Sequence, residues 1–281
     1  MGHYTGYFYF MKCDFLSCSR ICIMTIVAML WGCDGTATYE VRTEMIKVNS
    51  VSQIVMLNDS LVRPILYSNV MGLEHLPFYE AKAKFISAIL PSILVAKHRI
   101  HNTRNRIETL STKSIWNESD SLYYSEMKRR YKARDIQDLK GRLVTLPNSV
   151  VLAQAAIETG WGESRFFKQA SNLFGIWSFD ANESRIAAGK NRSDNTIFLR
   201  SYDDMSGSID DYFEVLARHH AYRGLRKARL TTSNPYALVP HLRNYSERKG
   251  WYTRQLKRVI RQNKLTKYDR YRIDPNYLVL E

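Results

Sequence analysis

The side chain best suited to chemistry in this sequence is the carboxylate of Glu158. It is the only acid in the segment Val150–Gly162, whose apolar residues predict a helix that is buried on nearly all sides. Burial disfavours a charged carboxylate, and so does the negative end of the helix dipole, because Glu158 lies in the last turn before Gly160. We therefore expect a raised pKa for Glu158, which suits a general acid. The alternative is a structural carboxylate that pairs with a neighbour such as Arg165.

Polar and aromatic residues surround this acid in the sequence. Gln154 lies one helical turn before Glu158 on the same face and can orient its carboxylate. Trp161 stands between two glycines in the turn that follows, where its ring offers a plane on which a sugar can stack. The aromatic loop Asn172-Leu-Phe-Gly-Ile-Trp177 comes shortly afterwards. An acid grouped with aromatic side chains favours chemistry on a sugar.

Several blocks of the sequence together resemble a known protein family. The blocks 153–162 and 172–175, with Ser164-Arg-Phe166 between them, are similar to the bacterial glucosaminidase domain of flagellar muramidase-type hydrolases and many autolysins. The resemblance is nearer to the Bax-type branch of this family. Further matching segments are residues 89–94, 222–226, 245–252 and 260–263.

This resemblance implies an α+β fold, mainly α, in which a lysozyme-like helical lobe faces a small β-lobe across a substrate cleft. It implies an endo-β-N-acetylglucosaminidase that hydrolyses β-1,4 bonds of peptidoglycan glycan strands without a cofactor or metal. Glu158 would protonate the leaving oxygen, and Tyr245 would stand near it. Thr159 departs from the family, where serine is common, and Trp177 replaces the lysine of autolysins. The residues expected to bind sugar are Gln154, Trp161, Asn172, Phe174, Gly175, Trp177 and Tyr252.

A second catalytic carboxylate is harder to assign. Glycosidases usually pair two acids, about 5–5.5 Å apart for retention and about 6.5–9.5 Å apart for inversion. The resemblance implies that the second acid lies in the β-lobe. We expect Asp194 to be this acid, and Glu183 is the second choice. Asp180, which also lies earlier in the chain than Asp194, is a further candidate. Each of these is equally explained as a solvated loop charge. Assistance by an acetamido group of the substrate would remove the need for a protein nucleophile.

The charge balance indicates an anionic partner. Lys and Arg number 41 against 27 Asp and Glu, for a net charge of +14. No nucleic-acid-binding motif is visible, so we expect no nucleic acid partner. Adjacent His219 and His220 diverge on a helix, which disfavours a metal site. Four arginines either hold an anionic polymer or form surface salt bridges: Arg200, Arg218, Arg223 and Arg226.

Rival functions remain open at this point. A lytic transglycosylase or muramidase would also need one glutamate on the same substrate. A non-catalytic glycan-binding envelope protein could keep the fold without the chemistry. A basic nucleic-acid binder would show salt-sensitive retention of DNA.

The N-terminal region predicts export. All four cysteines lie before residue 34, which excludes a disulfide framework and a thiol nucleophile from the remainder. A basic flank, the apolar run Ile21–Leu30 and small residues after it predict a signal peptide over residues 1–33. Leu30-Trp-Gly-Cys33 resembles a lipobox, in which Cys33 would be acylated and would anchor the protein to the membrane. The alternatives are an ordinary signal peptide and an uncleaved anchor. We expect an exported monomer in the bacterial cell envelope.

Composition and periodicity then divide the rest of the chain. We expect a linker over 34–76, an N-terminal helical extension over 77–146, the catalytic domain over 147–265 and a C-terminal tail over 266–281. Pro91 should end or kink the first helix. We expect a loop and a short, irregular hairpin over 172–200, and a helix over 205–219 whose apolar stripe is buried. Asn148 or Ser149 should cap the helix that carries Glu158. The pairs Asp203–Asp204 and Asp210–Asp211 suit a helix start, where the dipole favours acids.

Overall fold

The computed structural model describes residues 38–190 and 196–280. The predicted signal segment 1–33 and its Cys33 lie outside the described residues. So does Asp194, the first choice for the second catalytic acid. In the described part of the chain, no helix is both long enough and apolar enough to cross a membrane.

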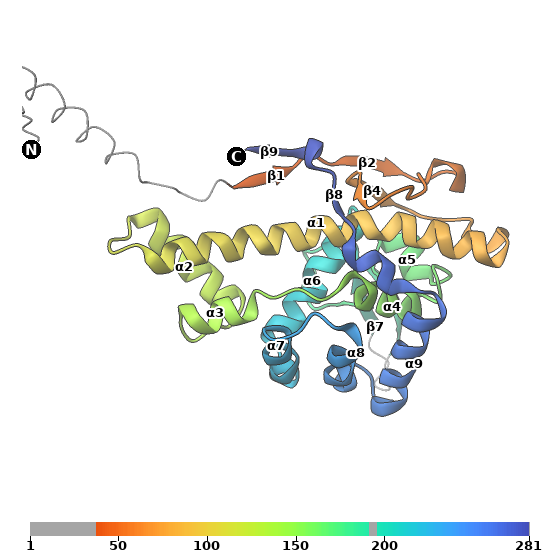
Figure 1. Cartoon of the computed structure of the whole chain (residues 1–281). Helices are drawn as coiled ribbons and strands as arrows, with labels where there is room; N and C mark the ends of the chain where they lie inside the picture. The colour runs from red at the N-terminus through yellow and green to blue at the C-terminus, as the bar shows by residue number, and fades with distance from the viewer. Residues whose placement is uncertain (1–37, 191–195, 281) are drawn as a thin grey trace, which may run out of the picture. The chain divides into compact units, whose positions relative to one another are not determined.

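A long central helix, α1 (Phe78–Thr112), organises the fold (Figure 1). Its middle third, from Phe85 to Ala96, is buried on every face, and this explains why no simple apolar stripe marks it. Of the two effects expected of Pro91, the helix end is wrong, because Pro91 lies inside α1. Packing on all sides outweighs the cost of about 3 kcal/mol that an interior proline imposes.

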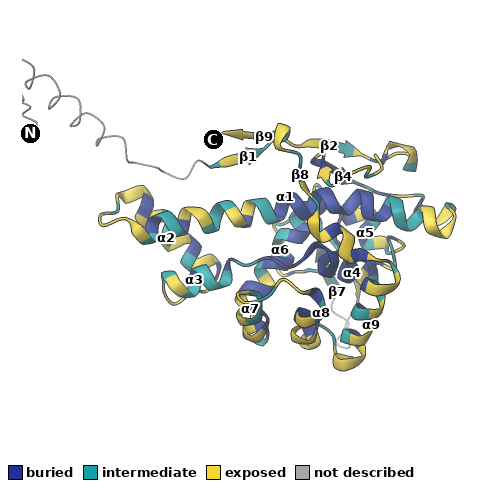
Figure 2. Cartoon of the chain, viewed as in Figure 1, coloured by how far each residue is buried: buried dark blue, intermediate teal, exposed yellow. Residues whose placement is uncertain are grey.

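Shorter helices surround α1 and form a mainly helical body (Figures 1 and 2). Figure 2 shows that the buried residues concentrate where α1, α4 and α6 meet. The α+β class with mainly α content, expected from the sequence, is confirmed. The α-helices are α2 (Glu118–Arg130), α3 (Ile136–Arg142), α4 (Asn148–Thr159), α5 (Arg165–Ala170), α6 (Met205–Arg218), α7 (Arg223–Arg229), α8 (Pro235–Leu238) and α9 (Lys249–Gln262). The 3-10 helices are η2 (Val51–Gln53), η3 (Leu73–His75), η4 (His220–Tyr222), η5 (Val239–Tyr245), η6 (Leu265–Arg270) and η7 (Pro275–Tyr277).

The segment expected to be a linker is part of the folded unit. Strands β1 (Tyr39–Val41), β2 (Glu44–Lys47), β3 (Leu61–Val62) and β4 (Ile65–Ser68) lie along α1 (Figure 1). β2 and β4 pair in parallel, and Val48, Ile54 and Tyr67 are almost inaccessible to solvent. Residues 38–76 therefore belong to the core rather than to a linker.

The C-terminal tail closes this layer. β8 (Arg272–Ile273) pairs in parallel with β3, and β9 (Leu278–Leu280) pairs antiparallel with β1. The tail also supplies the cap of α4, because the carboxylate of Asp269 accepts hydrogen bonds from the amide and the hydroxyl of Ser149, at 2.7 and 2.8 Å. The prediction that Asn148 or Ser149 caps α4 is therefore wrong, since the cap comes from 120 residues away.

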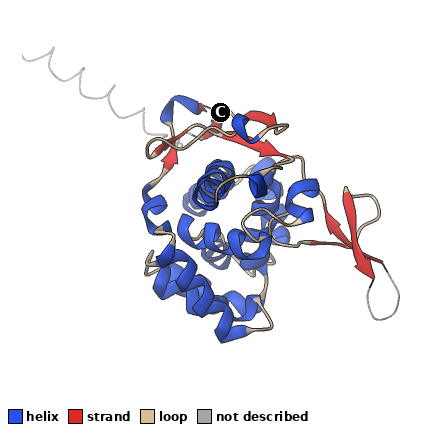
Figure 3. Ribbon diagram, turned by 90° about the vertical axis from the view of Figure 1, so that its right-hand side faces the viewer, coloured by secondary structure: helices blue, strands red, loops and turns tan. Residues whose placement is uncertain are grey.

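A second β region stands apart from the first. β5 (Trp177–Ser178), β7 (Thr196–Arg200) and β6 (Arg185–Lys190) form an antiparallel sheet in the order β5-β7-β6. Figure 3 shows this sheet projecting from the helical body. The irregular hairpin predicted between residues 172 and 200 is confirmed, and the irregularity is a register shift between Ala187 and Gly189.

Candidate active site

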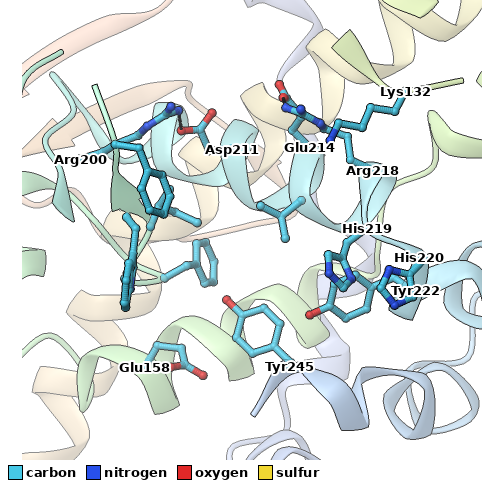
Figure 4. Close-up of a pocket in the computed structure, with 16 residues that line it drawn as sticks. Lys132, Glu158, Arg200, Asp211, Glu214, Arg218, His219, His220, Tyr222 and Tyr245 are labelled. Carbon is cyan, nitrogen blue, oxygen red and sulfur yellow. Dashed lines mark hydrogen bonds and ion pairs between the residues drawn. The ribbon is translucent and has the colours of Figure 1, made fainter. Parts of the chain in front are cut away.

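A cavity of about 840 Å³ brings Glu158 together with residues from several other parts of the fold (Figure 4). Its walls come from the residue Lys132 after α2, the end of α4, the segment around β5, the end of β7, one face of α6, η4 and the last residue of η5. These segments lie up to 113 residues apart, between Lys132 and Tyr245, and the packing of helices around α1 brings them together.

Glu158 ends α4 and opens into this cavity. Gly160 takes a left-handed conformation with φ 60°, which stops the helix directly after the acid. The side chain is accessible from the cavity, while the helix that carries it is buried. Desolvation by the surrounding protein raises the pKa of Glu158, as expected from the sequence, and a hydrogen bond from Tyr252 lowers it in part.

No cation neutralises Glu158 among the described residues. The alternative partner, Arg165, instead donates to the backbone oxygen of Ala187 in β6, at 2.7 Å. The interpretation of Glu158 as one half of a structural ion pair with Arg165 is therefore wrong. A partly desolvated carboxyl without a cation keeps its proton to a higher pH than an ordinary glutamate does.

Three buried side chains form a hydrogen-bonded chain that ends on Glu158. Tyr212 donates to the Oε1 atom of Gln154, whose Nε2 donates to the hydroxyl oxygen of Tyr252, at 3.0 Å. Tyr252 in turn donates to Oε1 of Glu158, at 2.9 Å. Each group in this series donates a hydrogen bond to the next, so Oε1 of Glu158 is an acceptor. A proton on the Glu158 carboxyl therefore lies on Oε2.

This chain revises two of the predicted roles. Gln154 is completely buried and Tyr252 is nearly so, and neither lines the cavity, so the geometry does not support direct contact with a sugar. Gln154 orients Glu158 through Tyr252 rather than by touching it. Burial and the charge of Glu158 raise the pKa of Tyr252, which keeps its hydroxyl a donor.

Tyr245 lines the cavity next to Glu158, as the sequence led us to expect (Figure 4). Its ring stacks on Tyr252 with centroids 5.7 Å apart and meets Tyr212 edge-on at 6.1 Å. Burial, together with the charge of Glu158, raises the pKa of Tyr245 well above its usual value. Tyr245 therefore presents a neutral hydroxyl to the cavity.

The aromatic loop divides into a lining part and a structural part. Phe174, Gly175 and Trp177 line the cavity, with Phe174 stacked on Tyr212 at 4.3 Å and Trp177 about half exposed. Asn172 is buried and does not line it. The side-chain nitrogen of Asn172 donates to the backbone oxygen of Ile176, and its side-chain oxygen accepts from the backbone amide of Ile176. Asn172 therefore holds the loop and does not face the cavity.

Trp161 lies outside the cavity. Its ring packs against Phe85 of α1 at 5.4 Å, and the ammonium of Lys82 lies 4.5 Å from its centroid. The turn has the shape that the sequence indicated, with positive φ at Trp161 and Gly162, but it points the ring toward α1. A Cβ at Gly162 would lie 2.8 Å from Leu73, so this close approach requires glycine.

The two described candidates for the second acid do not line the cavity either. Glu183 pairs with Arg200 at 3.0 Å, and a hydrogen bond from Ser178 is the main cause of its lowered pKa. Asp180 lies at the exposed turn before β6, where it accepts from the amide of Asn182. Neither residue faces Glu158 across the cavity.

Sequence reasoning missed two carboxylates on α6 that do line it. Asp211 accepts from Arg200 and from the Tyr202 hydroxyl, both at 2.7 Å. Glu214 pairs with Arg130 at 2.9 Å and with Arg218. Figure 4 shows both acids on the opposite side of the cavity from Glu158.

Helical periodicity contained the signal for these two acids. The apolar stripe predicted for α6 is buried as expected, and residues 211, 214 and 218 fall together on its other face. Asp204 caps α6 through the amide of Ser206, but Asp210 and Asp211 lie well inside the helix, so the prediction of a helix-start role is wrong for them. Seven further lining residues were not predicted as site residues: Lys132, Ile176, Phe179, Val215, His219, His220 and Tyr222.

Comparison with known proteins agrees with this geometry. Residues 133–265 match the family model Glucosaminidase, described as mannosyl-glycoprotein endo-beta-N-acetylglucosaminidase. The resemblance to the glucosaminidase family that the sequence indicated is thereby confirmed for this segment. The enzyme class expected from the sequence, a glycoside hydrolase, is thereby confirmed. The protein Bax of Escherichia coli (strain K12) is similar, with 24% identity over 196 residues, which are 65% of this chain and 69% of that protein.

Several solved structures are also similar to this chain. The catalytic domain of the autolysin Auto from Listeria monocytogenes is 20% identical, with a TM-score of 0.38, over 59% of this chain and 96% of that domain. A peptidoglycan hydrolase from Sphingomonas sp. A1 is 23% identical, with a TM-score of 0.36, over 50% of this chain and 92% of that structure. The glycoside hydrolase domain of FlgJ from Salmonella typhimurium is 22% identical, with a TM-score of 0.35, over 51% of this chain and 89% of that domain.

Proposed function

We propose that this glucosaminidase-family domain hydrolyses peptidoglycan, cutting the β-1,4 bond after N-acetylglucosamine, with Glu158 as the general acid. The observation that supports the proposal is the environment of the Glu158 carboxyl. Its carboxyl opens into the cavity, has no cation among the described residues and has a pKa raised by desolvation. A protonated acid in this position can donate to the glycosidic oxygen as the bond breaks.

The hydrogen-bonded chain behind Glu158 supports this role. Tyr252 holds Oε1, so the proton rests on Oε2 and the carboxyl keeps a single orientation. Gln154 and Tyr212 are buried behind Tyr252 and fix its hydroxyl in turn. Preorganised groups of this kind accelerate reactions because they need no rearrangement at the transition state.

The cavity walls suit a glycan strand. Trp177 and Phe179 are exposed at its rim, with ring centroids 6.0 Å apart, and can stack on sugar rings. Phe174 lines the floor beside Tyr245. We propose Phe174, Gly175 and Trp177 as sugar-binding residues and Tyr245 as a neutral hydroxyl beside the reacting bond.

The group that completes the reaction is proposed on sequence grounds alone. Asp194 stays the predicted second carboxylate, and an acetamido group of the substrate is the alternative that needs no protein nucleophile. Glu183 is committed to Arg200, and we do not propose it further. The α6 acids Asp211 and Glu214 are held by arginines and by Tyr202, and we assign them to the shape and charge of the wall.

The experiment that tests the function uses purified sacculi and mass spectrometry of the released fragments. Glucosaminidase action leaves reducing N-acetylglucosamine ends, muramidase action leaves reducing muramic ends, and a lytic transglycosylase leaves anhydro ends. Reducing N-acetylglucosamine ends that disappear in Glu158→Gln support the proposal. Binding of sacculi without any cleavage would instead favour a non-catalytic envelope protein.

We further propose that the protein is exported to the cell envelope, where its substrate lies, and acts there as a monomer. The predicted signal segment 1–33 supports export, and acylation of Cys33 would hold the protein at the membrane. Fractionation of cells carrying Cys33→Ser tests this point. Release of the variant from the membrane fraction is expected, and its retention there would contradict acylation at Cys33.

A further inference from the structure

A second, basic cavity of about 580 Å³ adjoins the candidate active site. It lies between α3 and α7, and Arg218 and His220 line both cavities. A group attached to a glycan in the first cavity can therefore reach the second without leaving the protein surface. The first cavity is lined by aromatic rings and paired acids, whereas cations dominate the second.

Two arginines form the base of this basic cavity, Arg226, which is buried, and Arg142, which is partly buried. Arg142 donates to the backbone oxygens of Ala217 at 2.9 Å and Tyr131 at 3.2 Å, and Arg226 donates to those of Leu216 at 2.8 Å and His219 at 3.0 Å. Both guanidinium groups thus converge on the carbonyl end of α6, where the helix dipole favours positive charge. Their positions are fixed by backbone groups rather than by acids alone.

Few carboxylates offset these cations. Asp135 and Asp138 line the cavity, against Arg134, Arg142, Arg218, Arg223, Arg226 and Lys227. Asp138 pairs with two of the arginines, Arg142 at 3.0 Å and Arg134 at 3.5 Å. Burial lowers the pKa of Arg226, and the nearby charges of Arg142 and Arg223 lower it further. The cavity therefore keeps an excess of positive charge.

Arg223 and Lys227 add exposed charge at its rim. They stand four residues apart on α7, on one face, where like charges repel. Within the part of the chain that the structure describes, neither has a carboxylate within 4.0 Å. Exposed cations above a fixed guanidinium base suit an anion that can accept several hydrogen bonds at once, such as a carboxylate.

We propose that this basic cavity binds the carboxylates of the peptides that branch from the glycan strand, so that the enzyme selects peptide-bearing strands. The proposal rests on the proposed hydrolysis of peptidoglycan. A peptide is favoured as the source of the anion because it is covalently attached to the sugar in the neighbouring cavity, which raises its effective concentration there.

The test compares two substrates, intact peptide-bearing glycan strands and strands whose peptides have been removed with an amidase. The wild-type enzyme should cleave the peptide-bearing strands with a KM about tenfold lower, since charge-assisted hydrogen bonds to one carboxylate are of that order. The double variant Arg223→Gln/Lys227→Gln should lose this preference and keep the wild-type rate on peptide-free strands.

A matched control is available on α9. Arg254 and Arg258 are also exposed and four residues apart, and they lie away from both cavities. Arg254→Gln/Arg258→Gln removes the same charge and should keep the preference. Equal KM values for both substrates in the wild type would overturn this inference and leave the proposed function untouched. An equal loss of preference in the control variant would have the same consequence. No cleavage of either substrate by the wild type would overturn the proposed function together with it.

Discussion

The two sides of the active-site cavity treat the same functional group in opposite ways. On the α4 side, Glu158 meets tyrosines and no cation among the described residues, and desolvation raises its pKa. On the α6 side, Asp211 and Glu214 are each held by arginine side chains. A carboxylate bound to guanidinium groups contributes negative charge and shape, whereas a desolvated one keeps a proton that it can give away. The surroundings of each carboxylate, rather than its residue type, therefore decide whether it can act as a proton donor or only contributes to the cavity wall.

The largest effect should come from removing the proton donor. Glu158→Gln keeps the size of the side chain and its contact with Tyr252 but cannot donate a proton to the leaving oxygen. Because general acid catalysis contributes about 10²–10⁴-fold, we expect kcat on sacculi to fall by that range with little change in KM. Glu163→Gln, an exposed glutamate in the following turn, is the matched control and should behave as the wild type. Full activity of the Glu158 variant would remove this residue from catalysis.

Breaking the hydrogen-bonded chain should have the next largest effect. Tyr252→Phe removes the donor that favours the charged form of Glu158, so the pKa of Glu158 should rise further. The general acid must be protonated, and activity is therefore lost as the pH rises through this pKa. The alkaline limb of the pH–rate profile should move upward by about one pH unit, since that shift corresponds to roughly 1.4 kcal/mol, with kcat lowered about tenfold by the lost orientation. A limb that moves downward would contradict the assigned direction of this hydrogen bond.

Changes to the α6 wall should cost less. Asp211→Asn and Glu214→Gln each remove one negative charge opposite Glu158 but no proton donor. We expect kcat to fall less than tenfold in each, because arginine already neutralises most of the charge. Steady-state kinetics on a soluble glycan measures this. A loss as large as that of Glu158→Gln in either variant would make that residue the missing second carboxylate and would replace Asp194 in this role.

The smallest effect should come from the aromatic rim between the two sides. Trp177→Ala removes an exposed ring without disturbing the core. We expect KM to rise about fivefold with kcat unchanged, because a ring contact of this kind contributes about 1 kcal/mol. A change in kcat alone would show that Trp177 acts on the reacting bond rather than on binding.

Local sequence determined much of the structure on the α4 side of the cavity. The apolar run before Glu158, the glycine two residues after it and the absence of other acids determine a buried helix with a carboxylate in its last turn. Local periodicity also predicted α6 and its buried stripe, and the hairpin of β6 and β7. These features follow from side-chain period, helix termination and burial, which depend on neighbours within a few residues.

Local sequence patterns do not show which distant segments of the chain contact one another. Trp161 was expected at the cavity and faces α1, because the direction of its ring depends on which helix packs against the turn. Strands β1 and β3 pair with a tail more than 200 residues away, as in Tyr39 opposite Leu280, so neither segment shows its partner in its own pattern.

The sequence by itself determined that this protein places one acid at the end of an apolar helix beside an aromatic loop. Tertiary structure alone decided what surrounds that acid. Tyr212 and Tyr252 reach Gln154 from 58 and 98 residues away, and no local rule connects them. The physical reason is that a pKa and a hydrogen-bond direction are set by whatever lies within a few ångströms in space, whereas periodicity reports only on neighbours along the chain.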